Sequence, residues 1–180
     1  MDARRPMTHD RCFARGDDRF ILSMPEAGHI DGLDALLNNA AVASWLGGPR
    51  SRDAIAEAIE RESRHWEQHR FGPWVVIDAM TRAVVGRGGL RRARVRERDE
   101  VELFYAVAPS SWKRGIATAL CRAAVDLGFE EAHIESVIAF TLEANRASQR
   151  VVEKLGFVRE DVFEHAGMPH VLFRLQKASA

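Results

Sequence analysis

The sequence predicts a single mixed α/β domain, and two observations carry this prediction. Segments with apolar residues at helical spacing alternate along the chain with short runs that are rich in β-branched and aromatic residues. In addition, no internal repeat and no Pro-, Gly- or Ser-rich linker divides the 180 residues, a length that suits one domain with a sizeable core.

The N-terminal part predicts one strand and two helices. Residues 1–17 are charged and show no periodicity, so we expect a mobile leader, with the domain spanning residues 18–176. Residues 19–23 predict a short strand. Residues 27–46 carry apolar side chains at helical spacing, and Gly47, Gly48 and Pro49 end that helix. Ser51 is expected to cap a second helix that runs to about residue 69.

The remaining elements alternate between strand and helix. Strands are predicted at 74–77, 84–90 and 101–107, and Gly88 and Gly89 in the second indicate a bulge or a close backbone approach. The charged run 91–99 is either a solvated hairpin tip or a binding surface. A helix at about 116–128, a strand at 133–141, a helix at 145–155 and a closing hairpin formed by 157–163 and 171–175 complete the domain.

The composition limits the classes of function. Lys plus Arg and Asp plus Glu both number 26, so we expect no nucleic acid held by bulk charge, although a local basic patch stays open. Apolar runs are too short to span a membrane, and the first residues are too polar for a secretory signal. Cys12 and Cys121 do not make a disulfide framework, which favours reduced thiols in the cytoplasm.

Residues 112–120 have the features of an anion-binding turn. They follow the apolar run 101–108 and open a helix, whose first N–H groups have no partner within the helix. Gly115 allows a ligand close to the backbone, and Lys113 and Arg114 add positive charge. A diphosphate would suit this turn, and a plain strand-to-helix connection is the alternative.

Two blocks at a fixed separation identify a resemblance. VELFYAVAPSSWKRGIATAL followed by VIAFTLEANRASQRVVEKLGF resembles the GNAT superfamily of N-acetyltransferases, and within it the RimJ/RimL-like branch, over residues 18–176. The resemblance implies a mostly antiparallel sheet of six to seven strands, about four helices, and a splayed parallel strand pair that holds the cofactor. It also implies acetyl-coenzyme A (acetyl-CoA) as donor and a primary amine as acceptor, on a protein N-terminus or a small molecule.

The resemblance also assigns the cofactor contacts. It places the pantetheine arm along the third of the strands 74–77, 84–90 and 101–107, and the diphosphate at the turn that follows this strand. It places the end of the pantetheine at an Asn-x-x-Ser pattern. Trp112 stands where the superfamily usually has Gln or Arg, as it often does in the RimJ/RimL-like branch. The residues so assigned are Phe104, Tyr105, Ala106, Val107, Ala108, Lys113, Arg114, Gly115, Ile116, Ala117, Thr118, Asn145 and Ser148.

The chemistry needs a base, a hydrogen-bond donor for the oxyanion, and a donor for the leaving thiolate. Glu102 is our candidate base, because burial would raise its pKa, although it could instead pair with an arginine from 87–94. The backbone N–H near Val107 could meet the oxyanion. Many relatives use a Tyr in the last helix, but no Tyr follows Tyr105, so Ser148 is our candidate proton donor, directly or through water.

Several further expectations complete the sequence-based hypothesis. His165 and His170 could reach the acceptor mouth or be ordinary surface histidines. No cluster has metal-ligand spacing, so we expect no metal. We expect no nucleic-acid or membrane partner, a monomer or a homodimer, and direct transfer in a ternary complex. The alternative function is a non-catalytic acyl-CoA sensor on the same scaffold.

Overall fold

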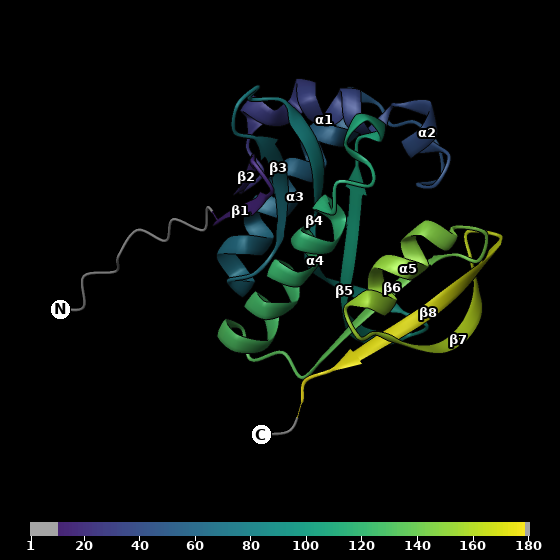
Figure 1. Cartoon of the computed structure of the whole chain (residues 1–180). Coiled ribbons are helices and arrows are strands. Elements are labelled where there is room, and N and C mark those ends of the chain that lie inside the picture. The colour runs from purple at the N-terminus through teal and green to yellow at the C-terminus, as the bar shows by residue number, and fades with distance from the viewer. Residues whose placement is uncertain (1–10, 179–180) are drawn as a thin grey trace.

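The computed structural model describes residues 11–178, and within them one sheet of eight strands runs through the molecule (Figure 1). The strands are β1 (Arg11–Arg15), β2 (Asp18–Ser23), β3 (Pro73–Asp78), β4 (Val84–Val95), β5 (Arg98–Val107), β6 (Ser136–Leu142), β7 (Val158–His165) and β8 (Met168–Gln176). The helices are α1 (Ile30–Leu37), α2 (Ala40–Ala43), α3 (Arg52–His69), α4 (Ile116–Asp126) and α5 (Arg146–Lys154). Short 3₁₀ turns η1 (Ala27–His29) and η2 (Pro109–Ser111) and the π-helix η3 (Leu127–Glu131) join them.

The strand order is β1-β2-β3-β4-β5-β6-β8-β7. Neighbouring strands are antiparallel except β5 and β6, which are parallel. In this parallel pair, Glu102 of β5 lies opposite Ile138 of β6. Figure 1 shows β5 and β6 diverging from this point, so the predicted mixed, mostly antiparallel sheet with a splayed parallel pair is confirmed.

Strand alternation divides the core into layers on the two faces of the sheet. On one face, α4 packs through residues such as Leu120 against strand residues such as Leu22 and Leu103. On the other face, α1–α3 pack through residues such as Leu33 and Ile55 against residues such as Val75 of β3. A smaller cluster, formed by Val95, Ile138 and Leu172, lies where the end of β4 packs on β6 and β8. The face that carries α4 also carries α5 (Figure 1).

The strand β1 corrects the predicted leader. Residues 11–15 pair antiparallel with β2 instead of being mobile, and the ring of Phe13 stacks on Phe20 at 5.1 Å. The segment is five residues long and alternates weakly, which is why its sequence shows no strand pattern. The ordered domain therefore begins before residue 18, and residues 1–10 of the expected leader lie outside the described residues.

The helical region 27–46 is also more divided than predicted. After α1, the Asn39 side chain accepts a hydrogen bond from Ala41 N at 3.0 Å and so begins α2 as a separate short helix. The Asn38 side chain bonds to the backbone of Arg50, which ties the end of α1 to the segment before α3. Asparagine competes with helix continuation through such local bonds, and this accounts for the additional helix.

Two glycines in β4 are required by close approach, as the sequence predicted. A Cβ on Gly88 would lie 2.4 Å from the Phe104 carbonyl oxygen, and one on Gly89 would lie 2.5 Å from the Gly72 carbonyl oxygen. Both neighbours are backbone atoms that cannot move aside cheaply. Gly88 therefore sets how closely β5 lies against β4, and Gly89 sets how closely β4 lies against the start of β3.

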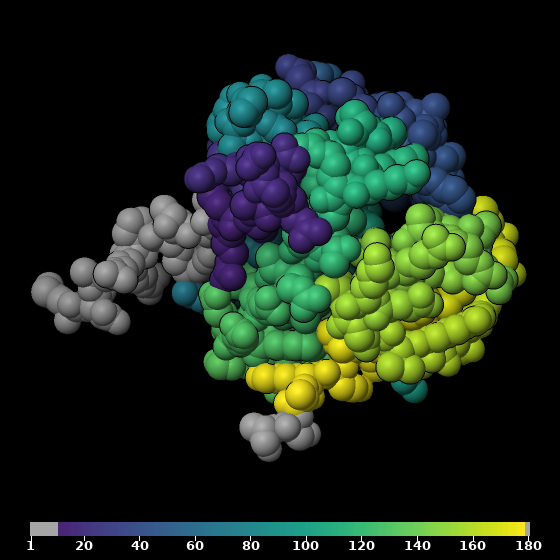
Figure 2. Space-filling view, viewed as in Figure 1, coloured from purple at the N-terminus to yellow at the C-terminus, as the bar shows by residue number. Residues whose placement is uncertain are grey.

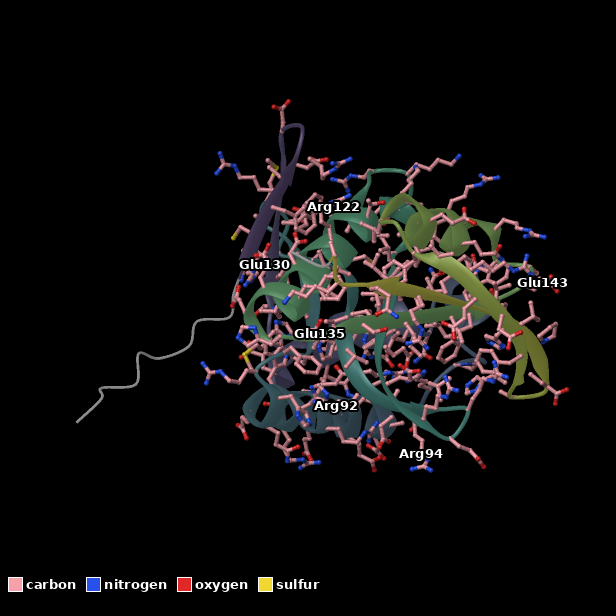
Figure 3. All side chains as sticks on the ribbon, turned by 90° about the horizontal axis from the view of Figure 1, so that it is seen from below. Arg92, Arg94, Arg122, Glu130, Glu135 and Glu143 are labelled. Atoms are coloured by element: carbon pink, nitrogen blue, oxygen red, sulfur yellow. The ribbon has the colours of Figure 1, made fainter. Side chains whose placement is uncertain are left out.

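The charged hairpin between β4 and β5 is partly solvated and partly paired. The side chains of Arg92 and Arg94 are exposed, and Arg94 lies at the outer edge of the molecule in Figure 3. Arg96 forms an ion pair with Asp161 of β7. None of the helices between residues 11 and 178 is long and apolar enough to cross a membrane.

Candidate active site

The gap between β5 and β6 exposes backbone groups of β5. Ala108 N donates to Val85 O of β4, so by the alternation of an antiparallel pair the N–H groups of Tyr105 and Val107 point away from β4, toward the gap. Figure 2 shows a recess between the green atoms that follow β5 and the yellow-green atoms of α5. An extended ligand in this recess could pair with β5 in place of the missing strand contacts.

The start of α4 has the backbone conformation of an anion-binding turn. Gly115 is the N-cap residue with φ of 76°, and no side chain in the described part of the chain caps this helix. The N–H groups of Ile116, Ala117 and Thr118 are therefore those that a helix start leaves without intrahelical partners. Together with the positive end of the helix dipole, they form a site that suits a diphosphate.

Arg15 of β1 lies at this helix start, and the sequence analysis did not single it out. An ideal Cβ on Gly115 would lie 2.4 Å from Arg15 Nη2, and Arg15 Nε donates to Arg114 O at 3.5 Å. A cation at the positive end of a helix is unfavourable unless an anion accompanies it. No signal in the sequence linked Arg15 to Gly115, because the contact depends on a strand that the pattern did not reveal.

Arg114, which we expected beside the diphosphate, is directed elsewhere. Its guanidinium forms an ion pair with Asp18 at 2.7 Å, lies 4.0 Å from Asp78, and sits over the ring of Phe20 at 5.3 Å. Lys113 is exposed in a left-handed conformation with φ of 62°. The cation that actually lies against Gly115 is therefore Arg15 rather than Arg114.

Trp112 fixes the turn to the end of β5. Its Nε1 donates to the Val107 carbonyl oxygen at 2.7 Å, while its ring is half exposed. This carbonyl oxygen points toward the gap, and it already accepts the hydrogen bond from Trp112. The indole thus explains why a tryptophan can replace the usual Gln or Arg at this position, since it holds the turn against the strand.

The start of α5 brings Asn145, Ser148 and Tyr105 together. Asn145 Oδ1 accepts from Ser148 N at 3.1 Å, so Asn145 caps the helix and leaves its amide NH₂ as the group that could contact a ligand. The hydroxyls of Ser148 and Tyr105 lie 2.7 Å apart, and the Tyr105 hydroxyl is also 3.1 Å from the Ser148 carbonyl oxygen. Burial raises the pKa of Tyr105 well above its usual value, so the phenol stays protonated.

Glu102 is buried at the narrow end of the gap, as predicted, and it forms the ion pair that was its alternative role. Its Oε2 and Oε1 accept from Arg91 Nε at 2.8 Å and Nη2 at 3.0 Å. Arg91 also lies over the ring of Phe104 at 4.6 Å. Since β5 side chains alternate, Glu102 and Phe104 face away from α4, toward the opposite side of the sheet from Tyr105.

The ion pair between Arg87 and Glu62 continues this row of charges to α3. Burial raises the pKa of the Glu62 carboxyl, while Arg87 and Arg91 oppose that rise. Arg87 is also 5.4 Å from the centre of the Phe104 ring, so two guanidinium groups flank this ring. The sheet face beside Glu102 is therefore lined by paired charges rather than by an acidic patch.

The two histidines of the closing turn belong to an aromatic cluster. The rings of His165 and His170 pack nearly perpendicular at 5.3 Å, and both contact Phe140 of β6. Phe163 of β7 completes the cluster. His170 is buried, so it is not a surface histidine, whereas His165 is exposed. Phe140 lies two residues beyond Ile138 on the face that Glu102 occupies, so this cluster borders the gap on the side opposite α5.

These features agree with a family match over most of the chain. Residues 19–158 match the model described as the acetyltransferase (GNAT) domain. The chain belongs to the GNAT acetyltransferase family. The GNAT family transfers acetyl groups from acetyl-CoA, and this chain is an acyltransferase enzyme.

Individual relatives extend over nearly the same length. The chain is similar to the uncharacterized N-acetyltransferase YoaA of Bacillus subtilis (strain 168), at 24% identity over 147 residues, 81% of this chain and 82% of YoaA. The solved structure of the ribosomal-protein-S5-alanine acetyltransferase from Vibrio fischeri matches with a TM-score of 0.77 at 14% identity, over 93% of this chain and 96% of that one. The spermidine N-acetyltransferase from Vibrio cholerae, solved with CoA and spermine, matches with a TM-score of 0.69 at 20% identity, over 87% and 95%. These structures share the GNAT fold with this chain.

Proposed function

We propose that this GNAT enzyme acetylates a primary amine, on a protein N-terminus or on a small molecule, and that it belongs to the RimJ/RimL-like branch. The observation that carries the proposal is the open β5–β6 gap beside the start of α4, where no described side chain caps the helix. The tryptophan at 112 and the Asn145–Ser148 pattern support the branch. The free thiols of Cys12 and Cys121 support a cytoplasmic location.

Acetyl-CoA, when bound, supplies a thioester whose carbonyl carbon the amine attacks. The N–H groups of Ile116, Ala117 and Thr118 and the guanidinium of Arg15 would hold the diphosphate, with Lys113 contributing charge. A Cβ on Gly115 would collide with the Arg15 guanidinium that would pair with the diphosphate, so the glycine fits the assignment.

The gap-facing backbone of β5, within residues 104–108, would orient the pantetheine arm. The N–H of Val107 faces the gap and is our candidate donor to the oxyanion. The amide group of Asn145 would contact the pantetheine end, because only its oxygen is used by the helix cap.

The acceptor would enter from the face that carries Glu102 and the aromatic cluster of Phe140, Phe163, His165 and His170. Glu102 remains our candidate base, and it must share its carboxylate with Arg91. A carboxylate has about four lone-pair positions, so two bonds from Arg91 leave room for one from an ammonium group. The charge-balanced wall formed by Glu62, Arg87, Arg91 and Glu102 gives no preference for a polycationic acceptor.

One observation favours a second candidate function, a non-catalytic acyl-CoA sensor. Both carboxylate oxygens of Glu102 already accept hydrogen bonds from Arg91, so an incoming amine would have to share this carboxylate with the guanidinium. The deciding experiment measures thiol release from acetyl-CoA across a panel of amines, amino acids, polyamines, aminoglycosides and peptides with free N-termini, with mass detection of products. We expect N-acetylated product with at least one acceptor class. Tight CoA binding without turnover across the whole panel would favour the sensor.

A further inference from the structure

A pair of hydroxyl groups bridges the two sides of the gap. Tyr105 comes from β5 and Ser148 from the first turn of α5, and their oxygen atoms are 2.7 Å apart. The Tyr105 side chain packs against the core on the α4 face, and Ser148 is partly buried. The pair therefore lies on the side of the gap opposite Glu102.

Counting hydrogens shows that this pair has two arrangements. The Tyr105 hydroxyl has one hydrogen and two acceptors within reach, the Ser148 hydroxyl at 2.7 Å and the Ser148 carbonyl oxygen at 3.1 Å. If Tyr105 donates to the carbonyl, then Ser148 donates to Tyr105. If Tyr105 donates to the Ser148 hydroxyl, the serine hydrogen becomes free for another acceptor. The exchange requires rotation of two hydroxyl hydrogens and no movement of heavier atoms.

The acidity of the two groups limits what they can do. Burial raises the pKa of the Tyr105 phenol, and an alcohol such as Ser148 is a much weaker acid than a thiol, whose ordinary pKa is about 8.5. Complete proton transfer from either hydroxyl to a thiolate is therefore uphill. A hydrogen bond donated to an anion needs no such transfer and is roughly twice as strong as one between neutral groups.

We propose that Tyr105 is a positioning residue that turns the Ser148 hydroxyl into a hydrogen-bond donor for the leaving sulfur, which departs as a thiolate. The inference rests on the acetyltransferase function proposed above. The N–C bond forms, the C–S bond breaks and its electron pair stays on sulfur. The amine proton passes to the base on the acceptor side, and the sulfur takes a proton from water after release. Ser148 then stabilises the anion instead of acting as the proton donor expected from the sequence.

A spectroscopic test uses the fact that Tyr105 is the single tyrosine of the chain. Incorporation of 3-fluorotyrosine places one ¹⁹F label beside the phenol hydroxyl. We expect CoA at pH 9, where a free thiol is substantially ionised, to shift this resonance, and desulfo-CoA, which lacks the sulfur, to shift it much less. The difference should disappear in Ser148→Ala. Equal shifts with both ligands in the unsubstituted chain would overturn the inference, and this holds even if variants of Tyr105 fail to fold.

A kinetic test separates positioning from a purely structural role. Tyr105→Phe and Ser148→Ala should each lower kcat about 10- to 100-fold, with the KM for acetyl-CoA changed less than about twofold. Because the two residues act in series, the double variant should be no slower than Ser148→Ala alone. Ser148→Thr, which keeps a hydroxyl, should recover much of the activity. Additive losses, or a raised KM with unchanged kcat, would contradict the proposed role.

The outcomes distinguish the two proposals. If the chain binds neither CoA nor desulfo-CoA, the proposed function fails and this inference fails with it. If the chain binds CoA and acetylates amines but shows no sulfur-dependent ¹⁹F shift, the proposed function stands and the hydroxyl pair has no role in leaving-group departure.

Discussion

Substitution of Gly115 tests the diphosphate seat most directly, provided that charge is separated from backbone strain. Gly115→Gln and Gly115→Glu place side chains of equal size at the same left-handed residue, where φ is 76°. A residue with a Cβ costs about 1–2 kcal/mol in this conformation, so both variants should lose that much free energy of unfolding. Both also displace the Arg15 guanidinium, which is the far end of a flexible side chain and moves cheaply.

The two variants differ only in charge, and that difference sets the expected effect on CoA binding. Two unit charges about 4 Å apart interact by about 4 kcal/mol at an effective dielectric of 20. Solvent and salt reduce this at a site that is only partly buried, so we expect about 2 kcal/mol, or roughly a 30-fold weaker affinity for Gly115→Glu than for Gly115→Gln. Glutamate would also attract Arg15 and remove it from the ligand, which acts in the same direction.

Calorimetric titration with CoA measures this ratio, and chemical denaturation of both variants provides the control. The ratio should shrink toward one as salt is raised, because the extra loss is electrostatic. Equal CoA affinities for the two variants at low salt, with equal unfolding free energies, would refute a diphosphate at the start of α4.

Glu102, His65 and Gly88 offer independent tests of the chemistry, of the pH dependence of stability and of the strand packing. Glu102→Gln should lower turnover about 100-fold with CoA affinity nearly unchanged, and an unaltered pH–rate profile would remove Glu102 from the mechanism. His65 forms hydrogen bonds through both ring nitrogens: Nδ1 bonds to the Phe71 carbonyl oxygen, and Nε2 accepts from Arg92 N at 3.0 Å. Burial lowers the pKa of His65, so the folded state binds fewer protons than the unfolded state at a pH near the ordinary histidine pKa. The free energy of unfolding should therefore fall as the pH drops from 7 to 5, through the ordinary histidine pKa near 6.5, and fall less steeply in His65→Gln; equal slopes in denaturant titrations would contradict this. Gly88→Ala puts a methyl group 2.4 Å from the Phe104 carbonyl oxygen and 2.6 Å from Tyr105 Cβ. This variant should lower the free energy of unfolding by at least about 1–3 kcal/mol in the same denaturant titration. A loss under about 0.5 kcal/mol would show that β5 is less constrained than described.

Local patterns in the sequence predict most helices and strands, because the spacing of apolar residues within a segment depends on that segment alone. Hydrophobic spacing predicts α3, α4, α5 and the seven longer strands, and it predicts the region of α1 and α2 as one helix instead of two. Gly88 and Gly89 indicate the close approach of β4 to its neighbours β5 and β3. The pairing of Glu102 with an arginine from 87–94 is also accessible, because a hairpin brings residues on its two strands into register, here Arg91 opposite Glu102.

Contacts between distant segments could not be predicted in the same way. Tyr105 and Ser148 are 43 positions apart, and their hydroxyl contact depends on how far β5 and β6 diverge. Arg15 meets Gly115 through a strand too short and polar to show a pattern. The direction of Arg114 is set by Asp18 at the start of β2, so a basic residue next to a glycine turn gives no information on where its guanidinium lies.

The strand β1 has a consequence for any shortened version of this protein. It runs alongside α4 from one end to the other, since Arg11 forms an ion pair with Glu131 just beyond the helix and Arg15 lies at Gly115. A polypeptide that started at residue 19, where the family match begins, would lose both anchors and leave β2 as the edge strand. The backbone groups of β2 that pair with β1 would then be unpaired, and Phe20 would lose its contact with Phe13. An exposed edge strand with apolar side chains promotes self-association, so truncation at residue 19 should yield protein that precipitates.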